Sequence, residues 1–263
     1  MRIIRFLDEN NHINLGHNYE NDSAVLLSGD MKDTGKIVRV KKLLAPILPP
    51  VILCIGLNYK EHAGETGFKL PEYPVLFMKN TASVTNPNDP IIIPRSCAKI
   101  PEVDYEIELA VVIGRTAKNV SVADAPYYVF GYTIGNDVSA RRWQKNAGSG
   151  QWVRAKSFDT FCPLGPVLVT PDEIPDPQSL QLTCSLNGNV MQNANTSDMI
   201  FTVAELVSYL SEDTTLLPGT VILSGTPGGV GYTRKPPVYL KPGDVLELKI
   251  DGIGTLVNPV TAA

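Results

Sequence analysis

The sequence has few of the features that mark several large classes of protein. No apolar run approaches the roughly 20 residues that a membrane span needs, and no basic stripe points to nucleic acid. The net charge is −4, from 23 basic and 27 acidic residues. The first residues resemble neither a signal peptide nor a transit peptide. We therefore expect no membrane or nucleic-acid partner and a cytoplasmic location, with a mitochondrial location as the alternative.

Histidine and cysteine, the usual ligands of zinc, are scarce. Only three histidines occur, at positions 12, 17 and 62, so a zinc site is not expected. The four cysteines are widely separated and include no Cys-x-x-Cys pair, which predicts reduced thiols in or near the core. No Gly-x-Ser-x-Gly motif is present, so the sequence does not predict a serine hydrolase either.

Turn-forming residues are frequent. The chain has 21 prolines and 21 glycines spread throughout, which suits many short strands. Asn187-Gly188 and Asp251-Gly252 each separate two strand-like runs and predict hairpins. Residues 202–210 combine a capping box with apolar positions at i, i+3, i+4 and i+7, which predicts a helix. Shorter helices are expected at 122–130 and 59–65. The pattern as a whole predicts a mainly β fold with some α-helix.

A group of prolines at positions 46, 49 and 50 divides the chain. Residues 1–49 are more polar and contain two strand-like pieces around a turn at 8–11. We expect them to form a small N-terminal β unit with a proline-rich joint, and residues 50–263 to form the catalytic domain. A chain of 263 residues can bury a sizeable core, so we expect any metal site to serve function rather than folding.

The main chemical signal lies in residues 103–114, which read as one strand. Period-two alternation places Glu106 and Glu108 on one face, and the segment becomes continuously apolar after Glu108. Carboxylates at the mouth of a buried strand repel each other and lose solvation, and a divalent cation relieves both costs. Oxygen ligands alone suit Mg²⁺, Mn²⁺ or Ca²⁺. On this segment alone, a solvated acidic strand face remains the alternative.

Further polar candidates follow other strand-like runs. The apolar run 129–136 ends in Asp137, and Arg141 and Gln144 come next; Lys156 follows an apparent strand at 151–155. A small flexible loop is expected between them, at 146–150.

A glycine-rich segment, GTPGGVG at 225–231, and a possible His–Glu pair complete the set. The glycine spacing does not match a dinucleotide fingerprint and suits close backbone approach to a small ligand. His62 and Glu65 would share one face of a helical turn, where a carboxylate can orient a histidine as a general base. An ordinary surface pair is the alternative interpretation.

Taken together, five ordered segments resemble the fumarylacetoacetate hydrolase superfamily over about residues 50–260. Within it, DTFCPLGP at 159–166 is similar to the branch of fumarylacetoacetate hydrolase domain-containing protein 2. The five segments are CIGLNY at 54–59 with His62 and Glu65, DYEIEL at 104–109, GNDVSAR at 135–141, AKSFD at 155–159 and GTPGGVG at 225–231.

The resemblance implies a β-rich mixed roll or sandwich, usually a homodimer, with one Mg²⁺ or Mn²⁺ per subunit, or Ca²⁺ in crystals. Glu106, Glu108 and Asp137 would be the metal ligands. The implied substrate is a small 2-oxo acid that can enolise.

The resemblance also assigns roles to the remaining candidates. Lys156 would meet the substrate and the charge that develops on it. The catalytic dyad, on a lid over the substrate, would be His62 and Glu65. The side chains implied to hold the carboxylate and oxo groups are Arg141, Gln144 and Thr226.

The fate of the enolate is left open by these motifs. Proton return gives tautomerisation, attack by water gives C–C hydrolysis, and loss of CO₂ gives decarboxylation. Leu57 stands where acylpyruvate hydrolases commonly have arginine, and Arg142 adds charge that suits a dicarboxylate. We therefore favour an oxaloacetate keto–enol tautomerase. The alternatives are an acylpyruvate or fumarylacetoacetate hydrolase, an oxaloacetate decarboxylase, and a non-catalytic metal-binding dimeric module.

Overall fold

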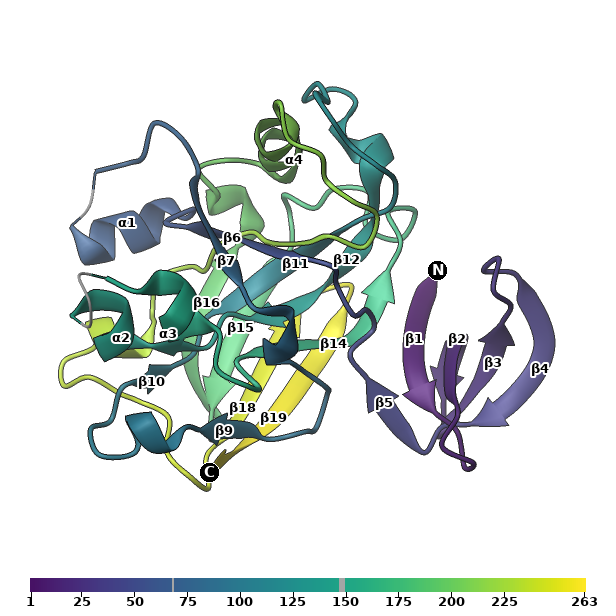
Figure 1. Ribbon diagram of the computed structural model, residues 1–263, viewed down its shortest axis with the longest axis horizontal. Helices are drawn as coiled ribbons and strands as arrows, with labels where there is room; N and C mark the ends of the chain where they lie inside the picture. Colours follow the sequence, from purple (N-terminus) through teal and green to yellow (C-terminus); the bar gives the residue numbers. More distant parts are fainter. Residues whose placement is uncertain (68, 147–149) are drawn as a thin grey trace.

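The computed structural model describes residues 1–67, 69–146 and 150–263. Strands dominate these residues and the helices are short (Figure 1), so the prediction of a mainly β fold with some α-helix is confirmed. Among the described helices, none has the length and apolar character needed to cross a membrane. The centre of the loop expected at 146–150, residues 147–149, lies outside the described residues.

The largest sheet follows the order β4-β3-β2-β1-β14-β12-β11-β17-β6-β7, with β5 beside β1 and β8 beside β14. Strand β11 lies inside this order and is buried at every position, so it forms part of the core. The strands are β1 Arg2–Leu7, β2 Ile13–Glu20, β3 Ser23–Leu27, β4 Asp33–Arg39, β5 Lys42–Leu44, β6 Ile52–Gly56, β7 Val75–Lys79, β8 Val84–Thr85, β11 Ile107–Ile113, β12 Val129–Asn136, β14 Cys162–Val169 and β17 Val221–Leu223.

A second sheet of five strands has the order β16-β15-β18-β19-β9. Both predicted hairpins lie in it and are confirmed. Asn187 and Gly188 have φ angles of 52° and 79° between β15 and β16, as a two-residue turn requires. The second turn is longer, because Ile250 pairs with Gly254. The strands are β9 Ile91–Ile93, β15 Gln181–Leu186, β16 Asn189–Asn195, β18 Val245–Ile250 and β19 Gly254–Ala262.

Helix α4, Val203–Ser211, confirms the capping box read from the sequence. The Thr202 side chain accepts a hydrogen bond from the Glu205 amide, and the Glu205 carboxylate accepts one from the Thr202 amide. The other α-helices are α1 Lys60–Thr66, which confirms the short helix expected at 59–65, α2 Arg141–Lys145 and α3 Trp152–Lys156. The 3₁₀ turns are η1 Thr81–Ser83, η2 Arg95–Cys97, η3 Ala125–Tyr128, η5 Thr196–Asp198 and η6 Gly231–Thr233.

Two predicted elements are wrong. The helix expected at 122–130 is only the 3₁₀ turn η3, because Val129 already pairs with Ile113 at the start of β12. The strand expected at 151–155 is helix α3, in which the Ala155 amide donates to the Gln151 carbonyl at 2.8 Å. Trp152 has a high strand propensity, but packing of its ring against Phe77 at 5.2 Å fits the helix.

The N-terminal strands gather on one side of the molecule (Figure 1). The predicted pair around the turn at 8–11 is confirmed as β1 and β2, and β3, β4 and β5 extend it. Strand β1 also pairs with β14 through Arg2 and Ile3, so the unit continues into the large sheet. The division of the chain at residues 49 and 50 stays a prediction.

Candidate functional site

The strand predicted over 103–114 is interrupted, and the interruption builds the site. Strand β10, Val103–Asp104, pairs with β13, Ser139–Ala140, whereas β11 starts only at Ile107. Between them, the Glu106 amide donates to the Asn136 side chain at 3.0 Å, and the Asp137 amide donates to the Glu106 carbonyl at 2.9 Å. The backbone therefore holds Glu106 and Asp137 side by side where the β11–β12 ladder ends.

Glu106, Glu108 and Asp137 form one buried cluster. Each offers a carboxylate oxygen, and these oxygens all lie within 4.8 Å of one another. The three side chains are almost fully buried, so the alternative of a solvated acidic strand face is wrong. Burial, together with the charges of Asp137 and Glu106, raises the pKa of Glu108 well above its usual value. Three buried carboxylates in mutual repulsion could hold a divalent metal ion.

Two lysine ammonium groups stabilise this cluster. Lys156 Nζ lies 2.8 Å from Glu106 and 2.5 Å from Asp137, and Lys79 Nζ lies 2.6 Å from Asp137. Burial opposes the charged form of Glu106, but Lys156 and Arg141 outweigh it and lower the pKa of Glu106 to about 2. Lys79 was not predicted. Its place two residues after Phe77 in an apolar strand shows that it shares the buried face, but not which residue it contacts.

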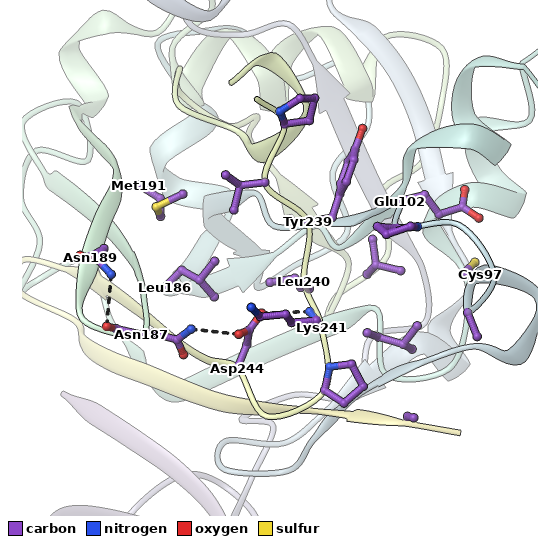
Figure 2. Close-up of a pocket in the computed structure, with 18 residues that line it drawn as sticks. Cys97, Glu102, Leu186, Asn187, Asn189, Met191, Tyr239, Leu240, Lys241 and Asp244 are labelled. Atoms are coloured by element: carbon purple, nitrogen blue, oxygen red, sulfur yellow. Dashed lines mark hydrogen bonds between the residues drawn. The ribbon is translucent and has the colours of Figure 1, made fainter. Parts of the chain in front are cut away.

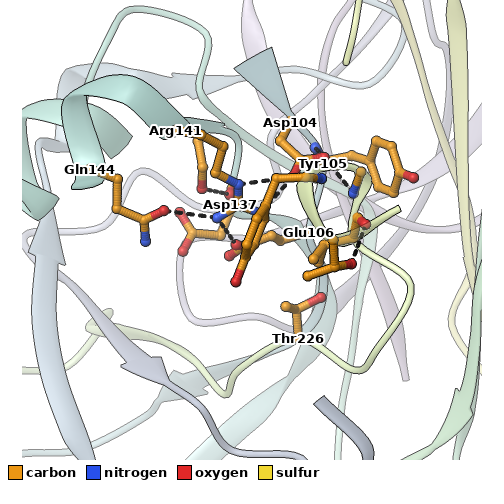
Figure 3. A network of polar contacts seen from close by, with 12 residues as sticks. Asp104, Tyr105, Glu106, Asp137, Arg141, Gln144 and Thr226 are labelled. Carbon is orange, nitrogen blue, oxygen red and sulfur yellow. Dashed lines mark hydrogen bonds and ion pairs between the residues drawn. The ribbon is translucent and has the colours of Figure 1, made fainter. Parts of the chain in front are cut away.

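Arg141 lies at the centre of a polar network (Figure 3). Its Nε donates to Asp104 at 2.8 Å, and its Nη1 contacts Glu106 at 2.7 Å and donates to Gln144 at 2.9 Å. Its Nη2 lies 2.8 Å from Asp104, but within the described residues it makes no hydrogen bond of good geometry. Arg141 is therefore held by Asp104, Glu106 and Gln144 while it lines the cavity, where its guanidinium can meet a ligand carboxylate.

The glycine-rich segment 225–231 is tied to β11. Thr226 Oγ1 donates to the Ile107 carbonyl at 2.9 Å and accepts from Gln192 Nε2 at 2.8 Å. The Gly225 amide donates to Glu108 at 2.7 Å, so this loop also orients one of the three carboxylates. Gln192 was not predicted, because a single polar residue in a hairpin strand gives no sequence signal.

His62 and Glu65 are paired as predicted. His62 Nδ1 lies 3.1 Å from Glu65 Oε2 on α1; His62 is buried, whereas Glu65 is exposed. Glu65 also accepts from the Gly229 amide and from Thr233 Oγ1 at 2.6 Å. Burial would raise the pKa of Glu65, but hydrogen bonds from His62 and Thr233 outweigh it and lower that pKa. Glu65 therefore bridges α1 and the glycine-rich loop as a carboxylate.

A cavity of about 600 Å³ is lined by most of these groups, although not by Asp137 or Glu65. The lining predicted from the sequence consists of His62, Glu106, Glu108, Arg141, Gln144, Lys156 and Thr226. Lys145, Trp152 and Tyr232 also line it and were not predicted. Arg142 does not line it. Its guanidinium donates to Glu102 and to the Ser96 carbonyl, so the expectation that Arg142 adds charge near the substrate is wrong.

A second cavity, of about 720 Å³, lies beside the β15–β16 turn (Figure 2). Its acidic side chains are used internally: Asp244 accepts from Asn187 Nδ2 and the Lys241 amide, each at 2.9 Å, and Glu102 binds Arg142. Within the described residues, the one group of carboxylates, thiols or imidazoles placed to hold a metal ion is the Glu106 cluster. The smaller cavity is therefore the candidate active site.

Known proteins with similar sequences and structures agree with this assignment. The family model described as "Fumarylacetoacetate (FAA) hydrolase C-terminal" matches residues 51–261. The chain is 50% identical to "Fumarylacetoacetate hydrolase domain-containing protein 2 homolog" of Dictyostelium discoideum, with 83% of this chain and 74% of that protein covered. It is also 50% identical to "Oxaloacetate tautomerase fahd2, mitochondrial" of Xenopus laevis, with 83% and 68% covered.

Among solved structures, the 5-carboxymethyl-2-hydroxymuconate delta-isomerase of Mycobacterium smegmatis superposes with a TM-score of 0.86. It is 39% identical, and both chains are covered completely. The similarity thus extends over the N-terminal strands as well as the region of the family model. The expected resemblance is confirmed, and the chain belongs to the fumarylacetoacetate hydrolase family of enzymes.

Proposed function

We propose that this enzyme interconverts the keto and enol forms of oxaloacetate with Mg²⁺ or Mn²⁺ as its metal. The observation that carries the proposal is the buried carboxylate cluster of Glu106, Glu108 and Asp137, whose two glutamates line one cavity with buried Lys156 and buried Arg141. Similar proteins from Xenopus laevis, Rattus norvegicus and Homo sapiens are named oxaloacetate tautomerases.

The side chains of the cavity supply the parts of this reaction. A metal ion held by the three carboxylates would act as a Lewis acid on the 2-oxo group. Arg141, which lines the cavity, would bind the adjacent carboxylate through its guanidinium. The Lys156 ammonium, whose pKa is raised by Asp137 and Glu106 against the effect of burial, stays charged and stabilises negative charge on the enolate oxygen.

His62 is the group that we assign to proton transfer at C3. When the enol becomes the ketone, the enol oxygen loses a proton and C3 gains one. His62 lines the same cavity as Glu106 and Glu108, and Glu65 orients its ring. A histidine with a carboxylate partner can both give and accept a proton, as reversible tautomerisation requires.

Hydrolysis of a C–C bond in an acylpyruvate is the second candidate function. The His62–Glu65 pair favours it, because a histidine oriented by a carboxylate can activate a water molecule. Among the described residues of the cavity, no contact specifically supports decarboxylation or a role as a non-catalytic metal-binding module.

Proton NMR of the reaction mixtures tests the proposal. Mg²⁺-loaded protein is incubated in D₂O with oxaloacetate and, separately, with an acylpyruvate. Tautomerisation exchanges the C3 protons of oxaloacetate faster than the metal-free control and leaves its carbon skeleton intact. Pyruvate from oxaloacetate would instead show decarboxylation, and cleavage of the acylpyruvate would show hydrolysis. Exchange at the same rate with and without protein would refute the tautomerase.

We also propose that the enzyme is a homodimer joined along β7. This strand ends the large sheet, and it contains no proline and only one charged residue, Lys79, which is buried. Leu76 and Met78 are exposed on it, a pattern that isolated edge strands avoid. Light scattering should give twice 28.6 kDa. Leu76→Lys should give the monomer. Val190→Lys, at an exposed position of β16, is the control and should remain a dimer. A dimer in both variants would place the interface elsewhere.

The names of the relatives favour a mitochondrial location over the cytoplasmic location expected from the sequence. The tautomerase relatives are named as mitochondrial proteins, which does not support the cytoplasmic location. We propose the mitochondrial alternative, which fractionation of the source cells would test.

A further inference from the structure

Lys145 is a third positive side chain that lines the active-site cavity, beside Arg141 and Lys156. It follows Arg141 by four residues on α2, so both side chains lie on one face of the helix. Its Nζ lies 3.6 Å from the centre of the Tyr232 ring, and the Arg141 guanidinium carbon lies 4.4 Å from the same centre. One aromatic ring therefore positions both cations beside the cavity that all three residues line.

Lys145 differs from the other two positive side chains of the cavity, which are paired with carboxylates. Arg141 forms ion pairs with Asp104 and Glu106, and Lys156 forms ion pairs with Glu106 and Asp137. Across the described ranges, no carboxylate forms an ion pair with Lys145, and its Nζ lies over the ring of Tyr232. Burial and the charge of Arg141 lower the pKa of Lys145, so an anion bound there would relieve an unfavourable environment.

We propose that Lys145, positioned by Tyr232, binds the second carboxylate of a dicarboxylic 2-oxo acid. The inference rests on the proposed function, in which Arg141 and a metal ion at the carboxylate cluster would hold the first carboxylate and the 2-oxo group. The far end of the substrate would then extend toward Lys145, which is exposed and lines the same cavity. Lys145 thus takes the role in selecting a dicarboxylate that the sequence suggested for Arg142.

The pair of ligands that tests this subsite differs in length and does not react. Oxalate has two carboxylate groups but ends beside the 2-oxo position, so it does not extend to Lys145. 3,3-Difluorooxaloacetate has the length and the second carboxylate of oxaloacetate and no C3 proton. Both are titrated by calorimetry into Mg²⁺-loaded protein. The variants are Lys145→Met, Lys145→Arg, Tyr232→Leu and, as a control on the exposed surface, Lys118→Met.

Lys145→Met should weaken difluorooxaloacetate about 10- to 100-fold, the value of a charge-assisted contact, and leave oxalate unchanged. Lys145→Arg should restore most of the affinity because it keeps the charge. Tyr232→Leu should give a smaller, selective loss, and Lys118→Met none. Equal losses for both ligands, or no loss for the longer one, would overturn the proposal.

Oxalate binding shows in each variant that the rest of the site is intact. Since neither ligand is turned over, the titration tests the subsite even if the NMR assay rejects the tautomerase.

Discussion

Asp104→Asn is the substitution whose effect the structure defines most closely. Asp104 is fully buried, and its two oxygens accept four hydrogen bonds: from the amides of Tyr105 and Gly231 at 2.9 and 2.8 Å, and from the Tyr232 amide and Arg141 Nε at 3.0 and 2.8 Å. Asparagine has the same shape but offers one oxygen and one NH₂ group. In either orientation of the amide, its NH₂ group faces two hydrogen-bond donors. The negative charge beside Arg141 is also lost.

The expected loss is about 3–5 kcal/mol in the free energy of unfolding, the cost of removing one partner of a buried ion pair. No cavity is created, so the loss measures electrostatics rather than packing. Because Arg141 then keeps its contacts with Glu106, Gln144 and the Tyr232 ring but loses the Asp104 carboxylate, its side chain should also shift. KM for oxaloacetate should therefore rise, by about 10-fold for one misplaced charged contact.

Urea denaturation of the metal-free protein measures the loss in the free energy of unfolding, and initial rates measure the change in KM. Asp251→Asn is the control, because Asp251 is exposed and forms only a 3.6 Å ion pair with exposed Lys249. A loss below about 1 kcal/mol for Asp104→Asn would show that Arg141 does not need the Asp104 charge. Its contacts with Glu106, Gln144 and Tyr232 would then be sufficient to hold it.

Further predictions concern the metal, a thiol and the dyad. Mg²⁺ should raise the melting temperature of the wild type but not of Glu108→Gln, which lacks a charged ligand; equal shifts would contradict the metal site. Burial and Glu102 raise the pKa of Cys97 to about 11. Its alkylation should therefore be slow at pH 8 and accelerate about tenfold per pH unit, and fast labelling at pH 8 would count against this. His62→Ala should lower kcat about 10²- to 10⁴-fold and leave oxalate affinity unchanged, whereas unaltered kcat would exclude His62.

The features that could be predicted from the sequence are those set by local chemistry. The Asn187-Gly188 turn follows from the φ angles that these residues tolerate, and the Thr202–Glu205 capping box is complete within four residues. The carboxylate cluster was predicted because its residues fall in ordered motifs. The break in the strand at Tyr105 was not predicted, because period-two alternation alone does not show where a ladder ends.

The missed features depend on contacts between distant segments. Lys79 reaches Asp137 from β7, and Gln192 reaches Thr226 from the second sheet. No local pattern reveals either contact. Arg142 was placed near the substrate because it follows Arg141, but neighbours on a helix point in different directions. It is Lys145, four positions from Arg141, that lines the cavity.

The most direct test of the central claim is the decay of the enol absorbance of oxaloacetate. The rate is measured with metal-free protein, with Mg²⁺-loaded protein and with Mg²⁺-loaded Glu106→Gln. We predict acceleration by the loaded wild type alone, with no pyruvate formed, because the cluster of Glu106, Glu108 and Asp137 holds the metal. Equal acceleration by metal-free protein or by Glu106→Gln would show that the reaction does not need a metal ion at this cluster.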